Sequence, residues 1–549
     1  MKLWLPLCAA ALFADDLWLR NGRVWTGDAS RPWAQSVLVR GNTIAAAGTN
    51  AEVAKQAKSA RVIDLAGRLT IPGFNDAHMH FLGGSLGLSQ IDLNGICTLE
   101  TMQKAIADFA AKHPGTGWLH GRGWEYVCLP QGRLPRKEDL DAIVKDRPVF
   151  LSAYDGHTAW VNSKALALAG VTKSTVFTGF GEVVKDANGE PTGALKEGAM
   201  GLVRKLVPVA TRADKLAAME QGLRLMASLG ITSLQNANGN MDELELYNEL
   251  INSNKLTVRA SLAMSIGPME TEASLKDFAA LHAKYPGPAL RVASVKMAVD
   301  GVIESYTAAM LEPYSNKKDT SGKPAWTQEQ FNKTATIVDK LGLQIYTHAI
   351  GDRGVRMALD GYEHVRRSNG PRDHRHRIEH IETIHPSDLP RFAALGVLPS
   401  MEPIHADPAT IEVWSAAIGP ERTRLGFAWR SIEKAGGRLV FSSDWPASIS
   451  VDPIRGLHNA VNRRTITGLP PNGWIPEERV SIETALRAYT INSSYASHEE
   501  KRKGTLQPGM LADIVVLSQD LFKVDPMNIH KTKVDLTIHD GRIVYTRKP

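Results

Sequence analysis

Two histidines separated by one residue, His78 and His80, end the segment IPGFNDAHMH. In an extended strand such residues project from the same face, so both imidazoles could bind one metal ion. The pair alone decides nothing, because the 17 histidines in 549 residues produce about 0.5 such pairs by chance. A second pair, His374 and His376, does occur. The interpretation therefore depends on which other residues join His78 and His80.

Further metal-binding residue types stand at the ends of apolar segments. His348 ends LQIYTHA, and Asp444 ends RLVFSSD. In HRHRIEH, strand alternation places His376, Ile378 and His380 on one face, with only His380 at the top. Together with the first pair, His348, His380 and Asp444 predict a divalent transition-metal site made of four imidazoles and a carboxylate, suited to zinc among other metals.

Lys296 is unusual because it lies in the apolar segment RVASVKMAVDG. Burying a charged amine is costly unless the charge is paired or removed. One solution is an ion pair with Asp300 or Glu304. Another is carboxylation of the amine, which would convert the cation into an anionic carbamate able to bridge two metals.

Eight apolar segments alternate with helical stretches, which is the number that a parallel β/α barrel requires. A barrel gathers residues from the ends of its strands around one cavity, and the residues named above fall at such ends. The expected fold is therefore α/β, a metal-dependent (β/α)8 TIM barrel. Its strands are expected in LTIPGFNDAHMH, ITSLQNA, RASLAMS, RVASVKMAV, LQIYTHA, HRIEHIE, GVLPSME and RLVFSSD.

Strand-rich segments with hairpin turns occur at both ends of the chain. They predict a small composite β-sandwich domain of residues 15–69 and 500–549, which leaves residues 70–499 for the barrel. Residues 82–230 follow the first barrel strand and are too many for a barrel loop. We expect a large insertion there, folded over the active site. The alternative is a remote accessory domain with a structural aromatic core.

Composition is typical of a globular protein, with 43% hydrophobic and 22% charged residues. The net charge is +6, from 64 basic and 58 acidic residues. Basic runs with interleaved aromatic residues are missing from the sequence, so a nucleic-acid partner is not expected. After the N-terminal apolar segment, no other apolar run approaches the length of a membrane span.

Residues 1–14 resemble a short signal peptide, with a buried first strand as the alternative. If this leader is cleaved, the protein is periplasmic or secreted; otherwise it is cytoplasmic. Cys8 would leave with the leader, and Cys97 and Cys128 would remain. Two cysteines make neither a disulfide scaffold nor a zinc knot, so cysteine usage does not determine the compartment.

Several motifs together resemble the amidohydrolase superfamily, and closely its amidohydrolase family 3 branch, which includes an N-substituted formamide deformylase. They are IPGFNDAHMH, VKMAVDG, YTHAIGD, HRIEHIE, FSSDWPAS, ALRAYTINSSYAS and GTLQPGMLADIVVL. The resemblance covers nearly the whole chain after the leader. It implies one or two divalent metals, a bridging carboxylated lysine at Lys296, and Asp444 as both ligand and proton shuttle. The other implied metal ligands are His78, His80, His348 and His380.

The resemblance also directs attention to the substrate pocket. Two positions depart from the family pattern: Asn75 replaces a branched apolar residue, and Glu402 replaces a glutamine at the end of the seventh strand. The change at Glu402 concerns the polarity of the pocket. Aromatic residues of the insertion, Trp160 among them, would favour substrates with aromatic or apolar parts. The predicted pocket residues are Trp124, Tyr154, Glu197, Glu402 and His405.

The predicted function is hydrolysis of a non-peptide carbon–nitrogen bond in a small molecule by metal-activated hydroxide. The bond is expected to be of amide type, with N-acyl and N-formyl groups as candidates. Asp444 would take the proton of the nucleophile and deliver it to the leaving nitrogen. One alternative is a mononuclear aminohydrolase that deaminates a heterocycle, against which Lys296 argues. Another is an inactive metal-binding barrel that acts as a binding protein. The sequence leaves open whether the chain forms a homodimer.

Overall fold

A computed structural model describes residues 16–130, 133–154, 156, 158–178 and 181–548. The predicted leader, residues 1–14, lies outside the described residues. The chain forms two compact units: unit 1 is Met1–His80 with Leu223–Pro549, and unit 2 is Phe81–Gly222. Among the described residues, no helix combines the length and the apolar character that crossing a membrane requires.

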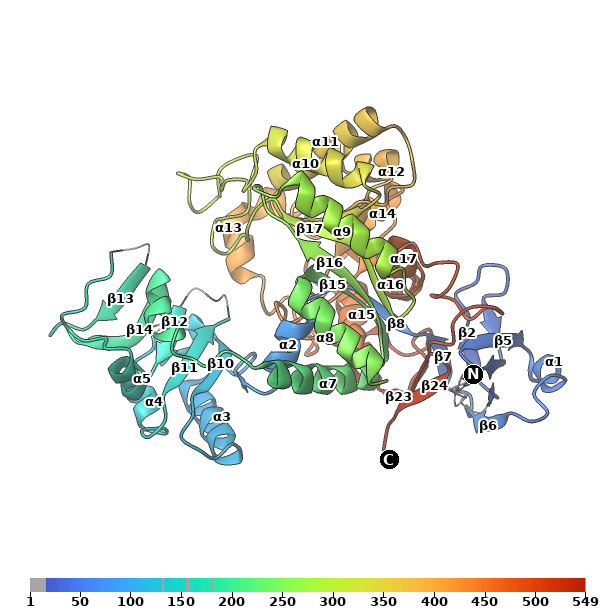
Figure 1. Cartoon of the computed structure of the whole chain (residues 1–549), viewed down its shortest axis with the longest axis horizontal. Helices are drawn as coiled ribbons and strands as arrows, with labels where there is room; N and C mark the ends of the chain where they lie inside the picture. The colour runs from blue at the N-terminus through green and yellow to red at the C-terminus, as the bar shows by residue number, and fades with distance from the viewer. Residues whose placement is uncertain (1–15, 131–132, 155, 157, 179–180, 549) are drawn as a thin grey trace, which may run out of the picture. The chain divides into compact units, whose positions relative to one another are not determined.

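Unit 1 contains an eight-stranded parallel sheet that curves into a nearly closed barrel (Figure 1). Its strands fall in the eight apolar segments expected from the sequence, but the first segment divides. Leu69–Pro72 forms β7 of another sheet, and only the following residues enter the barrel. In order around the sheet the strands are β8 (Phe74–Met79), β15 (Ile231–Gly239), β16 (Arg259–Ser265), β17 (Leu290–Ala298), β18 (Gln344–Ala349), β19 (Arg377–His380), β20 (Leu398–Met401) and β21 (Val440–Phe441).

The first and last barrel strands meet through residues that follow them. The Asp444 amide donates to the His78 carbonyl over 2.8 Å, and the His80 amide donates to the Trp445 carbonyl over 2.7 Å. These two bonds join the end of β8 to the segment after β21. The seam of the barrel therefore brings two predicted histidine ligands beside the predicted aspartate.

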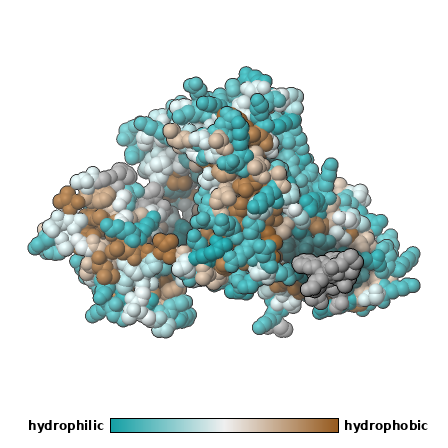
Figure 2. All heavy atoms as spheres, viewed as in Figure 1, coloured by the Kyte–Doolittle hydropathy of each residue, from teal (hydrophilic) through white to brown (hydrophobic). Residues whose placement is uncertain are grey.

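Helices cover the outside of the barrel, as Figure 1 shows for α8 to α11 around β15, β16 and β17. Asn240, Thr271 and Thr327 cap α8, α9 and α10 by accepting a backbone N–H of the first turn. The upper helices in Figure 2 show a mostly hydrophilic outer face. The helices are α8 (Met241–Asn252), α9 (Glu272–Lys284), α10 (Gln328–Lys340), α11 (Asp352–Asn369), α12 (Arg391–Leu395), α13 (Glu412–Thr423), α14 (Trp429–Lys434), α15 (Pro453–Asn462), α16 (Ile482–Tyr489) and α17 (Ile491–Ala496).

Strands from both ends of the chain share a six-stranded sheet of order β24-β23-β22-β7-β2-β3. A four-stranded sheet of order β5-β4-β1-β6 comes from the N-terminal segment, and residues of both sheets form one hydrophobic core. A separate composite domain of residues 15–69 and 500–549 stays a prediction. The strands are β1 (Leu17–Arg20), β2 (Arg23–Trp25), β3 (Trp33–Ala34), β4 (Ser36–Arg40), β5 (Thr43–Gly48), β6 (Arg61–Asp64), β22 (Ile514–Leu517), β23 (Val534–His539) and β24 (Arg542–Thr546).

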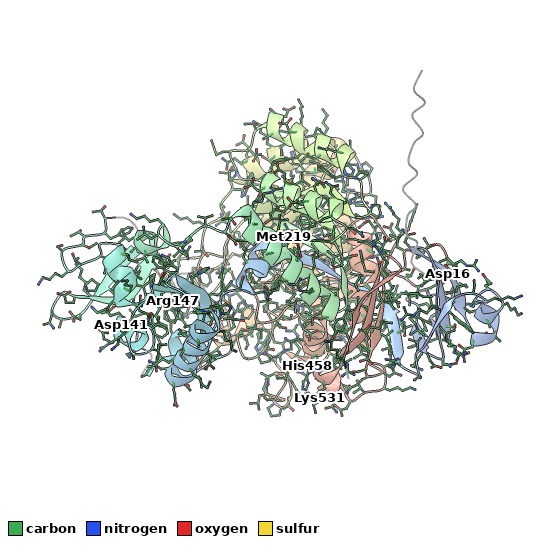
Figure 3. The ribbon with its side chains drawn as sticks, turned by 60° about the horizontal axis from the view of Figure 1, so that its bottom comes forward. Asp16, Asp141, Arg147, Met219, His458 and Lys531 are labelled. Atoms are coloured by element: carbon green, nitrogen blue, oxygen red, sulfur yellow. A yellow bond between two sulfur atoms is a disulfide. The ribbon has the colours of Figure 1, made fainter. Side chains whose placement is uncertain are left out.

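The C-terminal segment also packs on a barrel helix. The short helix η6 (Pro526–Lys531) lies against α15, and Figure 3 labels His458 and Lys531 at this contact. The Asn462 side chain donates to the Pro526 carbonyl over 2.8 Å, and the rings of His458 and His530 meet edge to face. This contact anchors the chain beyond β22 to the barrel.

Unit 2 has its own mixed sheet of order β13-β14-β12-β11-β10-β9 and its own hydrophobic cores. Cys97 and Cys128 form a disulfide here, a pairing that the sequence analysis did not predict. Placement of the insertion, residues 82–230, over the active site stays a prediction. The main elements are α3 (Leu99–Lys112), β9 (Ile91–Asp92), β10 (Leu119–Trp124), β11 (Val149–Ala153), β12 (Thr158–Val161), β13 (Gly181–Lys185), β14 (Pro191–Glu197) and α7 (Arg212–Ser228), which runs on into unit 1.

Candidate active site

His78, His80 and Asp444 converge at the barrel seam. The Asp444 Oδ1 atom lies 3.1 Å from His80 Nε2 and 3.5 Å from His78 Nε2. One potential ligand atom from each residue lies within 4.8 Å of the others. His78 and Asp444 are buried, whereas the His80 side chain is 30% exposed. The site is therefore shielded but retains one partly open side.

The residues at this point fit a divalent metal ion. The buried Asp444 Oδ1 atom has no hydrogen-bond partner among the residues that the structure describes, although two imidazole nitrogens lie close to it. A carboxylate oxygen that faces nitrogens without a hydrogen bond is suited to share a cation with them. Imidazole and carboxylate are ligands that zinc and related metals accept.

Lys296 joins this group from β17. Its Nζ atom lies 3.1 Å from His78 Nε2, and burial lowers the pKa of its amine. One alternative for Lys296, an ion pair with Asp300, is not formed, because that carboxylate instead accepts the backbone N–H groups of Ala309, Ile350 and Gly351. Burial raises the pKa of Asp300 to about 7. Lys296 thus faces the histidine cluster.

His348 and His380 complete the set that the sequence predicted. The His348 ring lies 4.5 Å from the His380 ring, and the His78 ring lies 5.0 Å from the His380 ring, measured between centroids. His348 Nε2 donates to the Gly301 carbonyl over 3.1 Å, which leaves Nδ1 as its ligand atom. The structure therefore brings all six predicted ligand residues to one end of the barrel.

The side chains of β19 do not alternate as the sequence analysis expected. His376 points to the surrounding helices, where it contacts Asp339 of α10 and stacks on Tyr362 of α11. Arg377 instead reaches across the barrel to β8 and β15. His380 returns to the centre because its φ of 74° breaks the alternation. The sequence rule therefore placed His380 correctly but assigned His376 to the wrong face.

Two predicted ligands have unusual backbones. His380 and Asp444 have φ values of 74° and 55°, in the left-handed region that favours glycine. Each such residue costs roughly 1–3 kcal/mol, and this strain concentrates at functional sites. The surrounding barrel must stabilise both conformations. This observation supports a functional role for both side chains.

Burial and neighbouring charges set the protonation of the cluster. Burial lowers the pKa of His380 to about 4 and also lowers the pKa of His78 well below its usual value. Burial alone would raise the pKa of Asp444, but His80, His380 and His405 hold it below its usual value. The site thus combines neutral His78 and His380 with an anionic Asp444, the forms that bind metal.

Among the predicted pocket residues, His405 lies beside the cluster. Its Nε2 atom is 3.6 Å from Asp444 Oδ2, and its ring is parallel to that of His380. Burial alone would lower the pKa of His405, but Glu382, Glu402 and Asp444 raise it to about 9. Glu402 itself is only 1% exposed. It lies behind His380, and its Oε2 atom is 2.9 Å from His380 Nδ1.

The remaining predicted pocket residues belong to unit 2. Trp124 and Trp160 are fully buried in its hydrophobic core, and Trp124 donates to the Leu151 carbonyl. These two indoles pack inside the insertion and have no face open to a ligand. Tyr154 is 37% exposed, and Glu197 has a φ of 49° at the end of β14. Pocket roles for Tyr154 and Glu197 stay predictions.

A second group of possible metal ligands, Asp339, His374 and His376, forms a hydrogen-bonded cluster behind the barrel. Asp339 accepts from both histidines and from Asn369, and Arg372 pairs with the same carboxylate. This carboxylate is already saturated with donors and lies against a guanidinium. The second His-x-His pair is therefore structural.

Sequence reasoning missed two buried charged residues, Arg377 and Glu379. Both side chains are 0% exposed and form an ion pair within β19, with Arg377 Nε 2.7 Å from Glu379 Oε1. Two charges in a short strand of a barrel core could have been noticed, because buried charges require partners. Arg377 and Glu379 need partners for the same reason as the buried Lys296 amine.

Comparison with known proteins identifies the family. Residues 61–545 match the amidohydrolase family. Protein LONG AFTER FAR-RED 3 of Arabidopsis thaliana is 31% identical over 518 residues, which cover 92% of this chain and 87% of that protein. N-substituted formamide deformylase of Arthrobacter pascens is 27% identical over 554 residues, which cover 97% and 98%. The crystal structure of an uncharacterized metal-dependent hydrolase from Pyrococcus furiosus aligns with a TM-score of 0.73 and 27% identity, covering 92% of this chain and 100% of that chain.

The chain therefore belongs to the amidohydrolase family. It is a metal-dependent hydrolase that acts on carbon–nitrogen bonds.

Proposed function

We propose that this enzyme hydrolyses an amide-type bond, N-acyl or N-formyl, in a small molecule. The observation that carries the proposal is the convergence of His78, His80 and Asp444, with ligand atoms within 4.8 Å of one another. The relative named N-substituted formamide deformylase, which aligns over nearly the whole of both chains, supports this substrate class. The metal ligands we propose are His78, His80, Lys296, His348, His380 and Asp444.

One or two divalent metals, with zinc our choice, would polarise the scissile carbonyl and lower the pKa of water. Asp444 would accept a proton on its carboxylate and return it to the leaving nitrogen. His405, 3.6 Å from the same carboxylate, would donate a hydrogen bond to a substrate oxygen. The partly exposed His80 side would admit the substrate.

Lys296 is the proposed bridge in a two-metal centre. Its amine would add to carbon dioxide, forming an N–C bond and releasing one proton, which gives a carbamate with two oxygen ligands. Lys296 is buried and lies beside His78 Nε2, and both facts support this role. The carbamate would place a negative charge among the metal ligands, where the unmodified ammonium group would place a buried positive charge.

The test combines metal content with turnover. Purified wild type is expected to hold about two metals per chain, and Lys296→Ala fewer. Asp444→Asn is expected to lose at least about 10²-fold in kcat on an N-formyl or N-acyl compound that the wild type hydrolyses. One metal per chain in both proteins, with turnover only of amino-heterocycles, would instead support the mononuclear deaminase. Full activity of Asp444→Asn would contradict the shuttle role.

We infer that the protein folds in an oxidising compartment, either the periplasm or outside the cell. The disulfide between Cys97 and Cys128 supports this location, since such bonds persist mainly there. N-terminal sequencing of the exported protein checks whether residues 1–14 are removed. An intact N-terminus on protein found only in the cytoplasm would contradict the inference.

A further inference from the structure

A buried ion pair lies directly behind the first predicted metal ligand. Arg377 and Glu379 of β19 are both fully buried, as is His78 of β8. Charged groups in such a place need a complete set of partners, because an unpaired buried charge is strongly destabilising. The partners of Arg377 and Glu379 therefore indicate the role of this ion pair.

Arg377 is held from three other strands. Its Nη1 atom donates to Gln235 Oε1 over 2.5 Å, and its Nη2 atom donates to the Ala77 carbonyl over 2.7 Å. The guanidinium also lies 3.6 Å from the centroid of the Tyr346 ring. Its remaining donors reach Glu379, at 2.7 Å from Nε to Oε1 and 3.1 Å from Nη2 to Oε2. The carboxylate is thereby held in one orientation.

The same carboxylate faces the ligand histidine. Glu379 Oε2 lies 2.7 Å from His78 Nδ1. A carboxylate bound by a guanidinium can only accept, so Nδ1 carries the ring proton and Nε2 keeps its lone pair. That Nε2 atom faces Lys296 Nζ at 3.1 Å and Asp444 Oδ1 at 3.5 Å. The lone pair therefore points into the proposed metal centre.

We propose that Glu379, locked by Arg377, is a positioning residue that fixes the tautomer and ring orientation of His78 and thereby sets the affinity for the metal. This inference rests on the proposed metal centre. Carboxylates behind ligand histidines hold the ring and increase its basicity, and their loss typically costs 10–100-fold in metal affinity.

The test measures zinc affinity by competition with a chelator, alongside the absorption spectrum of the cobalt-substituted protein. Arg377→Met with Glu379→Leu removes both charges together, so neither is left buried alone. We expect zinc affinity to fall about 10–100-fold and the cobalt spectrum to change. Glu379→Asp keeps the ion pair but withdraws the oxygen from His78, and is expected to weaken zinc binding too. If the double variant does not fold, the zinc affinity of Glu379→Asp alone tests the proposal.

Asp339→Asn is the matched control, because Asp339 is a buried carboxylate that contacts His376 away from the centre. It is expected to lower thermal stability while zinc affinity stays at the wild-type value. Folded Glu379 variants with wild-type zinc affinity and cobalt spectrum would overturn the positioning role. If the wild type itself binds no zinc or cobalt, the proposed function fails, which is a distinct result.

Discussion

Glu402 provides a test of positioning at the level of one residue. Its Oε2 atom lies 2.9 Å from His380 Nδ1, and its Oε1 atom accepts from the Ser442 hydroxyl over 2.9 Å. We predict that Glu402→Gln retains wild-type zinc affinity, because the amide oxygen can still accept from His380. Glu402→Leu is expected to bind zinc about 10–100-fold more weakly. Chelator competition on both variants measures the difference.

The two substitutions distinguish positioning from direct ligation. A carboxylate that binds the metal itself would be needed as an anion, so Glu402→Gln would then lose as much affinity as Glu402→Leu. Equal losses in the two variants would therefore contradict the positioning role. Wild-type affinity in the glutamine variant would also explain why a glutamine can occupy this position in the family that the sequence resembles.

At the residue scale, the convergence of the proposed ligand residues was predictable, but the residues that support them were not. His78, His80, His348, His380 and Asp444 stand at the ends of apolar segments, and a barrel brings such ends together. The opposite directions of His376 and His380 were not predictable, because the left-handed φ of His380 breaks the alternation. Local backbone strain of this kind leaves no signal in a hydrophobic pattern.

At the element scale, a buried ion pair helps to join the terminal sheet to the barrel. Arg259, the first residue of β16, donates to Asp513, which precedes β22, with Nε to Oδ2 at 2.7 Å. Burial alone would raise the pKa of Asp513, but Arg259 and His539 hold it below its usual value. Its contribution to stability is therefore present above the unfolded pKa of about 3.9 and is lost as pH falls toward the folded value.

We predict that Asp513→Asn lowers the free energy of unfolding at pH 7 by up to about 3–5 kcal/mol, because the buried Arg259 guanidinium loses its buried partner and keeps only the partly exposed Asp540. The variant should also lose part of the stability change that the wild type shows below about pH 4. Denaturant midpoints from pH 7 to pH 3 measure both effects. Glu272→Gln, which breaks an exposed pair with Lys276, is the control and should match the wild type. Identical pH profiles for Asp513→Asn and wild type would refute this role.

The barrel strands were the most predictable elements, since most of them are short apolar segments that alternate with helical stretches. The division of the first segment into β7 and β8 was not predictable. Leu69–Pro72 pairs with β22 from the other end of the chain, whereas Phe74–Met79 pairs with β15. Strand partners so distant in sequence are chosen by tertiary packing and not by local pattern.

At the scale of the whole molecule, the chain consists of two compact units with different means of stabilisation. The predicted metal ligands all belong to unit 1, whereas the disulfide between Cys97 and Cys128 lies entirely within unit 2. Unfolding of such a protein need not be a single two-state transition. Each unit can therefore be perturbed separately.

We predict that replacing Cys97 and Cys128 together by serine lowers the stability of unit 2 while zinc content stays unchanged. The bond closes a loop with a sequence separation of 31. A disulfide that closes a loop of about this length stabilises the folded state by roughly 2–4 kcal/mol, because it lowers the entropy of the unfolded chain. Limited proteolysis should then cut the variant first within residues 81–222. Mass spectrometry of the wild type without reductant is the control, and a mass with both thiols free would show that the bond is not formed. If the serine variant releases its zinc when unit 2 unfolds, the two units unfold as one.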